Sequence, residues 1–262
     1  MIDKKTTIIL ASRNDDYGKS PQTRLNNTLN FLLNLIYSLD LENLFDVLIL
    51  DYDSTSPLKE VCPNDPILNY LSIPKKELEF EKNLFPESRI FNIGVLNSSS
   101  NNFLKIDQDI IIGSNFFDFI LDTAKLPDIG FSGCRYIGNN SFFIEKDFYL
   151  KNSRFNYPLF QPDRCYNIFK RNNILPFYST YKGVLFFKKT LFQNLNGFNK
   201  ELIYQNYINI DFINRASIHY PIYNLGLKTN FDFYHQRHNM KDNKDRLENS
   251  YKNLSRINLN KN

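Results

Sequence analysis

Carboxylates follow two segments of the sequence that have the length and composition of buried strands. Asp51 comes directly after Asp46–Leu50, and Asp107 and Asp109 follow Phe103–Ile106. In an open parallel sheet, ligands bind at the carboxyl ends of the strands, so we expect these side chains to share one edge. Carboxylate oxygens suit a hard divalent cation, which can neutralise the charge of a departing diphosphate. The pattern therefore indicates chemistry on a nucleotide-sugar.

The D-x-D spacing of Asp107 and Asp109 is not specific by itself. The chain has 28 acidic residues, and Asp51-Tyr52-Asp53 has the same spacing. An aspartate after a strand can also be a turn or helix-cap residue, and this alternative applies to each of them. The functional interpretation depends on the elements around these residues.

Those elements are predicted to alternate between strand and helix. Thr6–Ala11 is a β-branched apolar run, and Ser20-Pro21 is a typical helix start before apolar residues at helical spacing up to Leu39. Strand, helix and strand in this order predict a parallel α/β sheet. Further strands are predicted at Ile67–Ile73, Phe103–Ile106, Asp128–Cys134 and Tyr181–Phe187, and further helices at Glu87–Ser98, Asn115–Lys125, Thr190–Leu195 with Gly197 as its end, Ile208–Ser217 and from Asp242 onward.

Composition narrows the class of protein. The 262 residues are 42% hydrophobic and 23% charged, which is ordinary for a globular chain, and they carry a net charge of +4, too small to argue for nucleic acid. Three scattered cysteines give neither a disulfide framework nor a zinc site. No apolar run has the length of a membrane span, and the N-terminal region lacks a signal-peptide core, so we expect a cytoplasmic protein. The basic tail from Lys241 to Lys261 is either a solvated helix face or a contact with the anionic inner face of a membrane.

Taken in order, the segments resemble the GT-A glycosyltransferases of family 2, with the closest likeness to bacterial capsule enzymes and the β-1,4-galactosyltransferase-like branch. The resemblance spans about Thr6 to Asn243. The segments that carry it are Thr7–Asn14 (TIILASRN), Val47–Ser54 (VLILDYDS), Arg89–Gly94 (RIFNIG), Phe103–Ile110 (FLKIDQDI) and Gly197-Phe198.

The resemblance implies one Rossmann-like α/β domain over residues 1–240, with a mixed, mostly parallel sheet flanked by helices. Its nucleotide-binding half would cover about 1–112 and its acceptor-binding half about 113–240, followed by a polar tail over 241–262. No linker or internal repeat separates these parts. The aromatic stretch Phe142–Tyr181 falls in the acceptor half, where its rings either stack on sugar or pack in the core.

The same resemblance assigns residues to the nucleotide-sugar donor. Asp51 would meet the uracil or ribose, and Ser12, Arg13 and Asn14 would line the nucleoside pocket. Asp107 would contact the donor. Arg89 would lie near the donor, or alternatively would pair on the surface with an acid such as Glu87. Asn92 and Gly94 are expected to support the helix and its close approach to the sheet.

A metal ion, Mn²⁺ or Mg²⁺, is implied as cofactor. Enzymes of this branch complete the metal site with a late histidine, and Tyr234–His238 contains two. Asp109 with His238 is the preferred ligand pair, and His235 is the next candidate. The alternative is two exposed loop histidines.

The general base is where the sequence departs from the family. Aligned on Arg215, the Glu-Asp pair of the family becomes Ile208-Asn209, and only Asp211 keeps a carboxylate. Either Asp211 is the base, or another acid such as Glu201 serves, or the chain is catalytically impaired. An i,i+4 ion pair between Asp211 and Arg215 is the structural alternative for Asp211.

The resulting hypothesis is a metal-dependent, inverting transfer of a hexose or N-acetylhexosamine from a UDP-sugar to a glycan or lipid-linked glycan, in capsule or lipopolysaccharide synthesis. The alternative is an impaired GT-A-like module that binds nucleotide-sugar or glycan. A nucleotidyltransferase is disfavoured because the loop Ser12–Lys19 has only Gly18, whereas such enzymes carry a glycine-rich phosphate loop.

Overall fold

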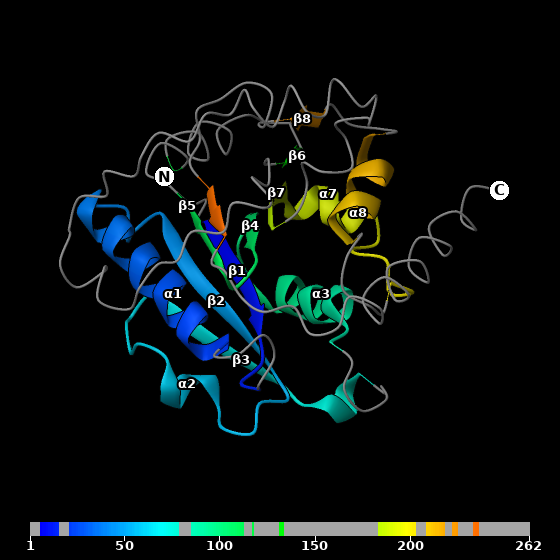
Figure 1. Cartoon of the computed structure of the whole chain (residues 1–262). Coiled ribbons are helices and arrows are strands. Elements are labelled where there is room, and N and C mark those ends of the chain that lie inside the picture. The colour runs from blue at the N-terminus through cyan, green and yellow to red at the C-terminus, as the bar shows by residue number, and fades with distance from the viewer. Residues whose placement is uncertain are drawn as a thin grey trace, which may run out of the picture.

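The computed structural model describes residues 6–15, 21–78, 85–112, 117, 131–133, 183–202, 208–217, 222–224 and 233–235. Within them the main feature is a seven-stranded sheet of order β3-β2-β1-β4-β7-β6-β8 (Figure 1). The strands of this sheet are β1 (Thr6–Ser12), β2 (Phe45–Tyr52), β3 (Leu68–Ile73), β4 (Asn102–Ile106), β6 (Phe131–Gly133), β7 (Val184–Lys188) and β8 (Ile222–Asn224). The helices are α1 (Pro21–Ser38), α2 (Leu58–Val61), α3 (Glu87–Asn97), α7 (Lys189–Asn194) and α8 (Ile208–Ser217), with a 3₁₀ turn η1 at Lys75–Glu77.

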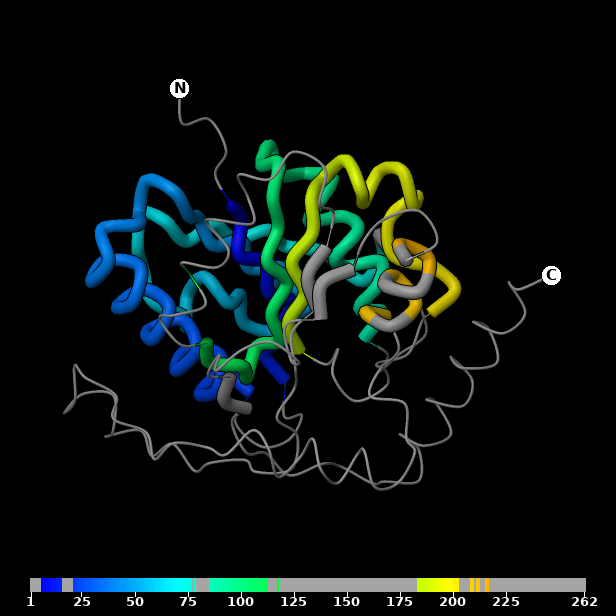
Figure 2. The backbone as a smooth tube through the Cα atoms, turned by 90° about the horizontal axis from the view of Figure 1, so that it is seen from above, coloured from blue at the N-terminus to red at the C-terminus, as the bar shows by residue number. Residues whose placement is uncertain are grey.

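One half of the sheet is parallel and the other is mixed. β3, β2, β1 and β4 all run in the same direction, whereas β7 is antiparallel to both β4 and β6, and β6 is parallel to β8. Seen from above, β4 and β7 run side by side through the middle of the molecule (Figure 2). The carboxyl ends of β1, β2 and β4 therefore meet at one edge, as the strand–helix–strand pattern predicts.

Helices cover both faces of the sheet, and each face has its own core (Figure 1). α1 places Leu25, Leu29 and Leu32 against Ile8 and Val47, all fully buried. These three leucines recur at i, i+4 and i+7, which is the period of one helix face. α2 belongs to the same layer.

The opposite face carries α3, α7 and α8, which bury an aromatic cluster. Phe198 lies 4.8 Å from Phe212 and 5.7 Å from Phe187 between ring centroids. α3 approaches the sheet closely at Gly94, where an added Cβ would stand 2.7 Å from side-chain atoms of Ile9 and Leu50. The expected supporting role of Gly94 is confirmed, because a larger residue there would push the helix off the strands.

A second, two-stranded sheet was not predicted. It pairs β5 (Ile110–Ile112) with β9 (Phe233–His235) in antiparallel register, so that Ile110 is opposite His235. β5 begins directly after Asp109, and β9 comes from a distant part of the chain. Both strands are three residues long, and so short a segment carries too little periodicity to predict this pairing.

The long predicted elements are confirmed. α1 begins at Pro21 and ends at Ser38, α3 covers Glu87–Asn97, and α8 covers Ile208–Ser217. Gly197 follows α7 with a φ of 74°, which suits a glycine at a helix end. Most of Asn115–Lys125, the stretch Phe142–Tyr181 and the tail from Asp242 lie outside the described residues. No helix in the described part is long and apolar enough to cross a membrane.

Candidate functional site at the carboxyl edge of the sheet

The ends of β1, β2 and β4 bring together the predicted donor residues other than Arg89, which lies on α3. Ser12 and Asp51 are register partners on adjacent strands. The Ser12 hydroxyl donates a short hydrogen bond to the side-chain carbonyl of Gln108, which lies between Asp107 and Asp109. Residues separated by about a hundred positions along the chain thus share one edge of the sheet.

Asp51 is the most buried carboxylate at this edge, with 5% of its surface exposed. Its Oδ2 accepts a hydrogen bond of 2.8 Å from the backbone N–H of Leu58, at the start of α2. Its Oδ1 is buried and has no hydrogen-bond partner among the described residues. A buried carboxylate oxygen without a donor is costly, so this atom is suited to accept a bond from a ligand N–H or O–H.

The loop after β1 packs against the loop after β2. The backbone N–H of Asn14 donates to the Ser54 hydroxyl at 2.8 Å. Arg13 pairs with Asp15 at 2.6 Å, and its guanidinium lies 5.9 Å from the ring centre of Tyr52. The predicted nucleoside-pocket residues therefore surround the end of β2, and their contact with a nucleoside stays a prediction.

The turn that holds Asp107 and Asp109 is fixed through its backbone. The N–H of Asp107 donates to the carbonyl of Gly183 at 2.8 Å, and the Thr28 hydroxyl of α1 donates to the carbonyl of Gln108 at 2.9 Å. Gly183 has a φ of 89°, and an added Cβ would stand 3.5 Å from Oδ2 of Asp107. The turn is thus anchored by the residue that precedes β7 and by α1.

Lys105 lies directly under this turn and was missed in the sequence. Its side chain is 1% exposed, and its Nζ donates to Oε1 of Glu87 at 2.8 Å and to Oδ1 of Asp107 at 3.0 Å. Burial alone lowers the pKa of Lys105, but Asp107 and Glu87 outweigh it and hold that pKa above its ordinary value. Burial raises the pKa of Glu87, and the charge of Lys105 opposes that rise. The sequence signal for this buried cation is a lysine within the apolar run Phe103–Ile106.

The proposed metal ligands are only partly described. Asp109 is 8% exposed, and Asp107 keeps 43% of its side chain exposed on the same turn. The backbone of His235 is paired with Ile110, the residue after Asp109, whereas His238 lies outside the described residues. Within the described part, no three His, Cys, Asp or Glu side chains form a metal-binding group. The two carboxylates fit a hard divalent cation, and the backbone places His235 beside them.

Three side chains of α3 hold the segment after α7. Ser88 donates to the carbonyl of Leu202 at 2.9 Å, and Arg89 donates to that of Lys200 at 3.2 Å. The amide of Asn92 forms a pair of bonds with the backbone of Phe198, at 2.8 and 2.9 Å. Asn92 has a supporting role, but it holds the backbone of Phe198 and not the contact of α3 with the sheet. A donor contact for Arg89 stays a prediction. Glu87, named as a surface partner for Arg89, pairs with Lys105.

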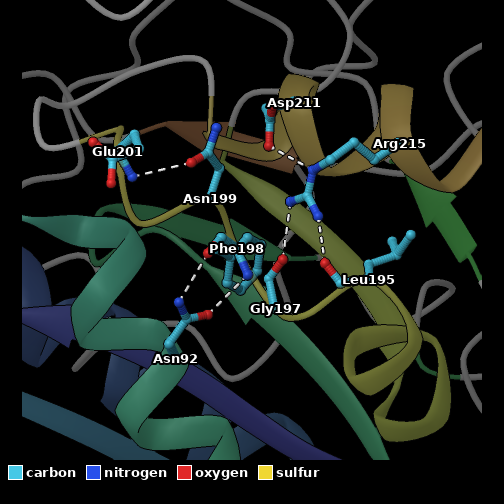
Figure 3. Close-up of polar contacts among 8 residues, drawn as sticks. All are labelled: Asn92, Leu195, Gly197, Phe198, Asn199, Glu201, Asp211 and Arg215. Atoms are coloured by element: carbon cyan, nitrogen blue, oxygen red, sulfur yellow. Dashed lines mark hydrogen bonds and ion pairs between the residues drawn. The ribbon is translucent and has the colours of Figure 1, made fainter. Parts of the chain in front are cut away.

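Asp211 forms the i,i+4 ion pair that was its structural alternative. Its Oδ2 lies 2.9 Å from Nε of Arg215, and its side chain is 6% exposed. The other two guanidinium nitrogens of Arg215 donate to the carbonyls of Leu195 and Gly197, at 2.7 and 2.9 Å (Figure 3). The pair therefore fastens α8 to the turn after α7.

Glu201 lies on the segment that α3 holds, and it is exposed (Figure 3). Its backbone N–H donates to the side chain of Asn199 at 3.0 Å. Its neighbours Lys200 and Leu202 bond to the first turn of α3, and that turn adjoins Lys105 through Glu87. Glu201 is therefore on the α3 side of the sheet, on a segment bonded to the first turn of that helix.

No model of a known protein family matches the chain, and no curated protein sequence matches it. Solved structures do. TarS 1–349 of S. aureus in complex with UDP-GlcNAc is 15% identical with a TM-score of 0.58, over 97% of this chain and 66% of that chain. Mannosyltransferase PcManGT from Pyrobaculum calidifontis, in complex with GDP-Man and Mn²⁺, is 11% identical with a TM-score of 0.55, over 85% of this chain. The chain spans 55% of the length of that mannosyltransferase chain.

A third structure is the catalytic domain of Drosophila β1,4-galactosyltransferase 7 in complex with xylobiose. It is 11% identical with a TM-score of 0.51, over 95% of this chain and 79% of that chain. At such identities the likeness establishes the fold alone. The chain therefore has the GT-A fold of the nucleotide-sugar glycosyltransferases, the fold that the order of its motifs predicts.

Proposed function

We propose that this chain is a metal-dependent glycosyltransferase that uses a UDP-sugar donor. The observation that carries the proposal is the meeting of Ser12, Asp51 and the Asp107–Asp109 turn at the carboxyl edge of the sheet. One solved structure with the same fold holds UDP-GlcNAc, and another holds GDP-Man together with Mn²⁺. The carboxylates here suit the same kind of ligand, a nucleotide diphosphate with a divalent cation.

The proposal gives each of these residues a role, and for Asp51 the surroundings support it. The buried, unpartnered Oδ1 of Asp51 would accept a bond from the base N–H or a ribose hydroxyl. Asp107 would contact the donor, and Asp109 with His235 or His238 would hold Mn²⁺ or Mg²⁺. The cation would supply positive charge beside the departing diphosphate.

The acceptor half of the reaction needs a base. A carboxylate would take the proton of an acceptor hydroxyl. The oxygen of that hydroxyl would bond to the anomeric carbon of the sugar as the bond between the sugar and UDP breaks. Asp211 is engaged by Arg215 and buried, whereas Glu201 is exposed beside the first turn of α3. This placement favours Glu201. The proposal also includes inversion at the anomeric carbon and transfer of a hexose or N-acetylhexosamine. The acceptor it includes is a glycan of the capsule or lipopolysaccharide type.

The first test is a thermal-shift titration with UDP, with and without Mn²⁺. Ligand binding to the native state raises the melting temperature by mass action. We expect a Mn²⁺-dependent rise in the wild type that Asp109→Ala abolishes. Asp46→Ala is the matched control, because Asp46 lies at the opposite end of β2 and bonds to Thr7. If UDP does not raise the melting temperature of the wild type at any concentration, with or without Mn²⁺, the proposal of a UDP-sugar donor is contradicted.

A binding module without turnover is the second candidate. It is favoured by one observation: α8 carries Asn209 in place of the family's acid, and its remaining carboxylate, Asp211, is tied to Arg215. UDP release from a panel of UDP-sugars separates the two candidates. Tight UDP binding with no release on any acceptor would support the module, and release that Glu201→Gln lowers at least tenfold would support the enzyme.

A further inference from the structure

Lys105 is a buried cation in the strand that leads to the Asp107 turn. β4 is buried along its whole length, and Lys105 shares the α3 face of the sheet with Phe103. Removing an ammonium group from water is costly unless it is paired and hydrogen-bonded. Its Nζ meets Glu87, Asp107 and the ring face of Phe91, whose centre is 4.5 Å away.

The two carboxylates around Lys105 are not equivalent. Glu87 lies at the start of α3, 2.8 Å from Nζ, and balances its charge. Asp107 adds a second negative charge that the pair does not require for neutrality. With 43% of its side chain exposed, Asp107 could be solvated by water alone. The contact therefore serves the orientation of Asp107 more than the burial of Lys105.

The contact with Lys105 uses one carboxylate oxygen of Asp107 and leaves the other, Oδ2, for a ligand. Lys105 takes Oδ1, at 3.0 Å, and the backbone N–H of Asp107 is held by Gly183. Backbone and side chain are both fixed, so the carboxylate is ordered before any ligand arrives. A group that is ordered in advance loses less conformational entropy on binding.

We propose that Lys105 is a positioning residue that orients Asp107 toward the nucleotide donor, with Glu87 as its counter-ion. The inference rests on the proposed function, because it requires that Asp107 contacts the donor. Lys105 itself is 1% exposed and is not expected to contact the nucleotide.

The experiment changes Lys105 without leaving a buried charge alone. The Lys105→Met/Glu87→Gln pair removes both charges, and Asp107→Asn leaves the Lys105–Glu87 pair intact. Combining the two changes completes a double-mutant cycle in which each variant avoids an unpaired buried charge. The readout is the dissociation constant for UDP at saturating Mn²⁺, measured well below the melting temperature and extended to millimolar UDP.

We expect the paired change to weaken UDP binding about tenfold in the wild-type background and less than about twofold in the Asp107→Asn background. Lys105→Arg keeps the charge and should recover most of the affinity. Lys189→Met is the matched control, because Nζ of Lys189 donates to the carbonyl of Ser98 at the amino end of the sheet. This control should bind UDP like the wild type.

The outcomes separate this role from the proposed function. Wild-type affinity in the Lys105→Met/Glu87→Gln variant, or a loss that simply adds to that of Asp107→Asn, would overturn the role of Lys105 alone. Failure of the wild type to bind UDP with Mn²⁺ would overturn the proposed function, and this role with it. A merely structural lysine would lower the melting temperature without this coupling to Asp107.

Discussion

Two cations in this molecule each pair with an aspartate, and they leave those aspartates in different states. Lys105 is 1% exposed, while its partner Asp107 keeps 43% of its side chain exposed. Arg215 is 30% exposed, while its partner Asp211 is 6% exposed. In the β4 pair the cation is buried and the acid is exposed, whereas in the α8 pair the acid is buried and the cation is more exposed.

This difference separates a carboxylate that can meet a ligand from one that fastens the fold. Arg215 also bonds to the carbonyls of Leu195 and Gly197, so the α8 pair joins a helix to a turn. Lys105 joins the Asp107 turn to the first residue of α3 instead. An aspartate four residues before an arginine predicts the ion pair, but only burial shows which acid remains accessible.

Neutralising the two cations should show the largest difference, in the free energy of unfolding. Lys105→Met leaves Glu87 without its counter-ion and should cost about 3–5 kcal/mol, the range for breaking a buried pair. Arg215→Met should cost about 1–3 kcal/mol. Arg215 itself is 30% exposed, so water can take the place of its guanidinium beside Asp211. Chemical denaturation at neutral pH measures both, and a larger loss for Arg215→Met would contradict the comparison.

The parallel half of the fold was predictable because its periodic signals are long. α1 repeats its leucines on one face, and β1 and β2 are continuous apolar runs, so their bounds follow the pattern within two residues. The edge position of Asp51 and Asp107 then follows from the rule for parallel strands. Strands β5, β8 and β9 are three residues each, and their pairing depends on distant partners.

The contacts within the site were not predictable in the same way. Lys105 stands in an apolar run whose alternation fixes its face, yet nothing local shows that Glu87, eighteen positions earlier, lies beside it. The hydrogen bond from Ser12 to Gln108 likewise depends on strand order. Asp211 is the opposite case, because its partner Arg215 lies one helical turn away and the pair was foreseen.

Removing one charge from each aspartate should produce opposite results. Asp107→Asn should weaken Mn²⁺-dependent UDP binding by about ten- to hundredfold, since hydrogen bonds to charged groups contribute about 1.5–3 kcal/mol. Asp211→Asn should leave UDP binding within about twofold and lower the free energy of unfolding by about 1–2 kcal/mol. Calorimetric titration measures the UDP affinity of both variants, and chemical denaturation measures their free energy of unfolding. If Asp211→Asn abolished UDP binding while the fold stayed intact, Asp211 would belong to the donor site.

Two glycines with positive φ offer a smaller test of the same contrast. Gly197→Ala places a Cβ 2.7 Å from Oδ1 of Asn92, the atom that binds the N–H of Phe198, in addition to a backbone strain of about 1–2 kcal/mol. Gly183→Ala meets the buried side chain of Ile110 at 3.0 Å, a less severe contact, and lies 3.5 Å from Oδ2 of Asp107. We expect Gly197→Ala to cost more stability and Gly183→Ala to cost more UDP affinity. Equal effects of both variants on UDP affinity would remove the distinction between the two regions.

The smallest expected effect concerns the stability of the α1 layer at alkaline pH. Burial, and then the charge of Asp51, raises the pKa of the Cys62 thiol to about 12. Because the folded pKa lies above the unfolded value of about 8.5, the stabilisation is complete below that value and is lost as the pH rises toward 12. The melting temperature should therefore fall between pH 9 and pH 11 more steeply in the wild type than in Cys62→Ala. Parallel slopes in the two proteins would show that the thiol is not protected by the fold, and the packing of α2 beside Asp51 would then be looser than its hydrogen bond to Leu58 implies.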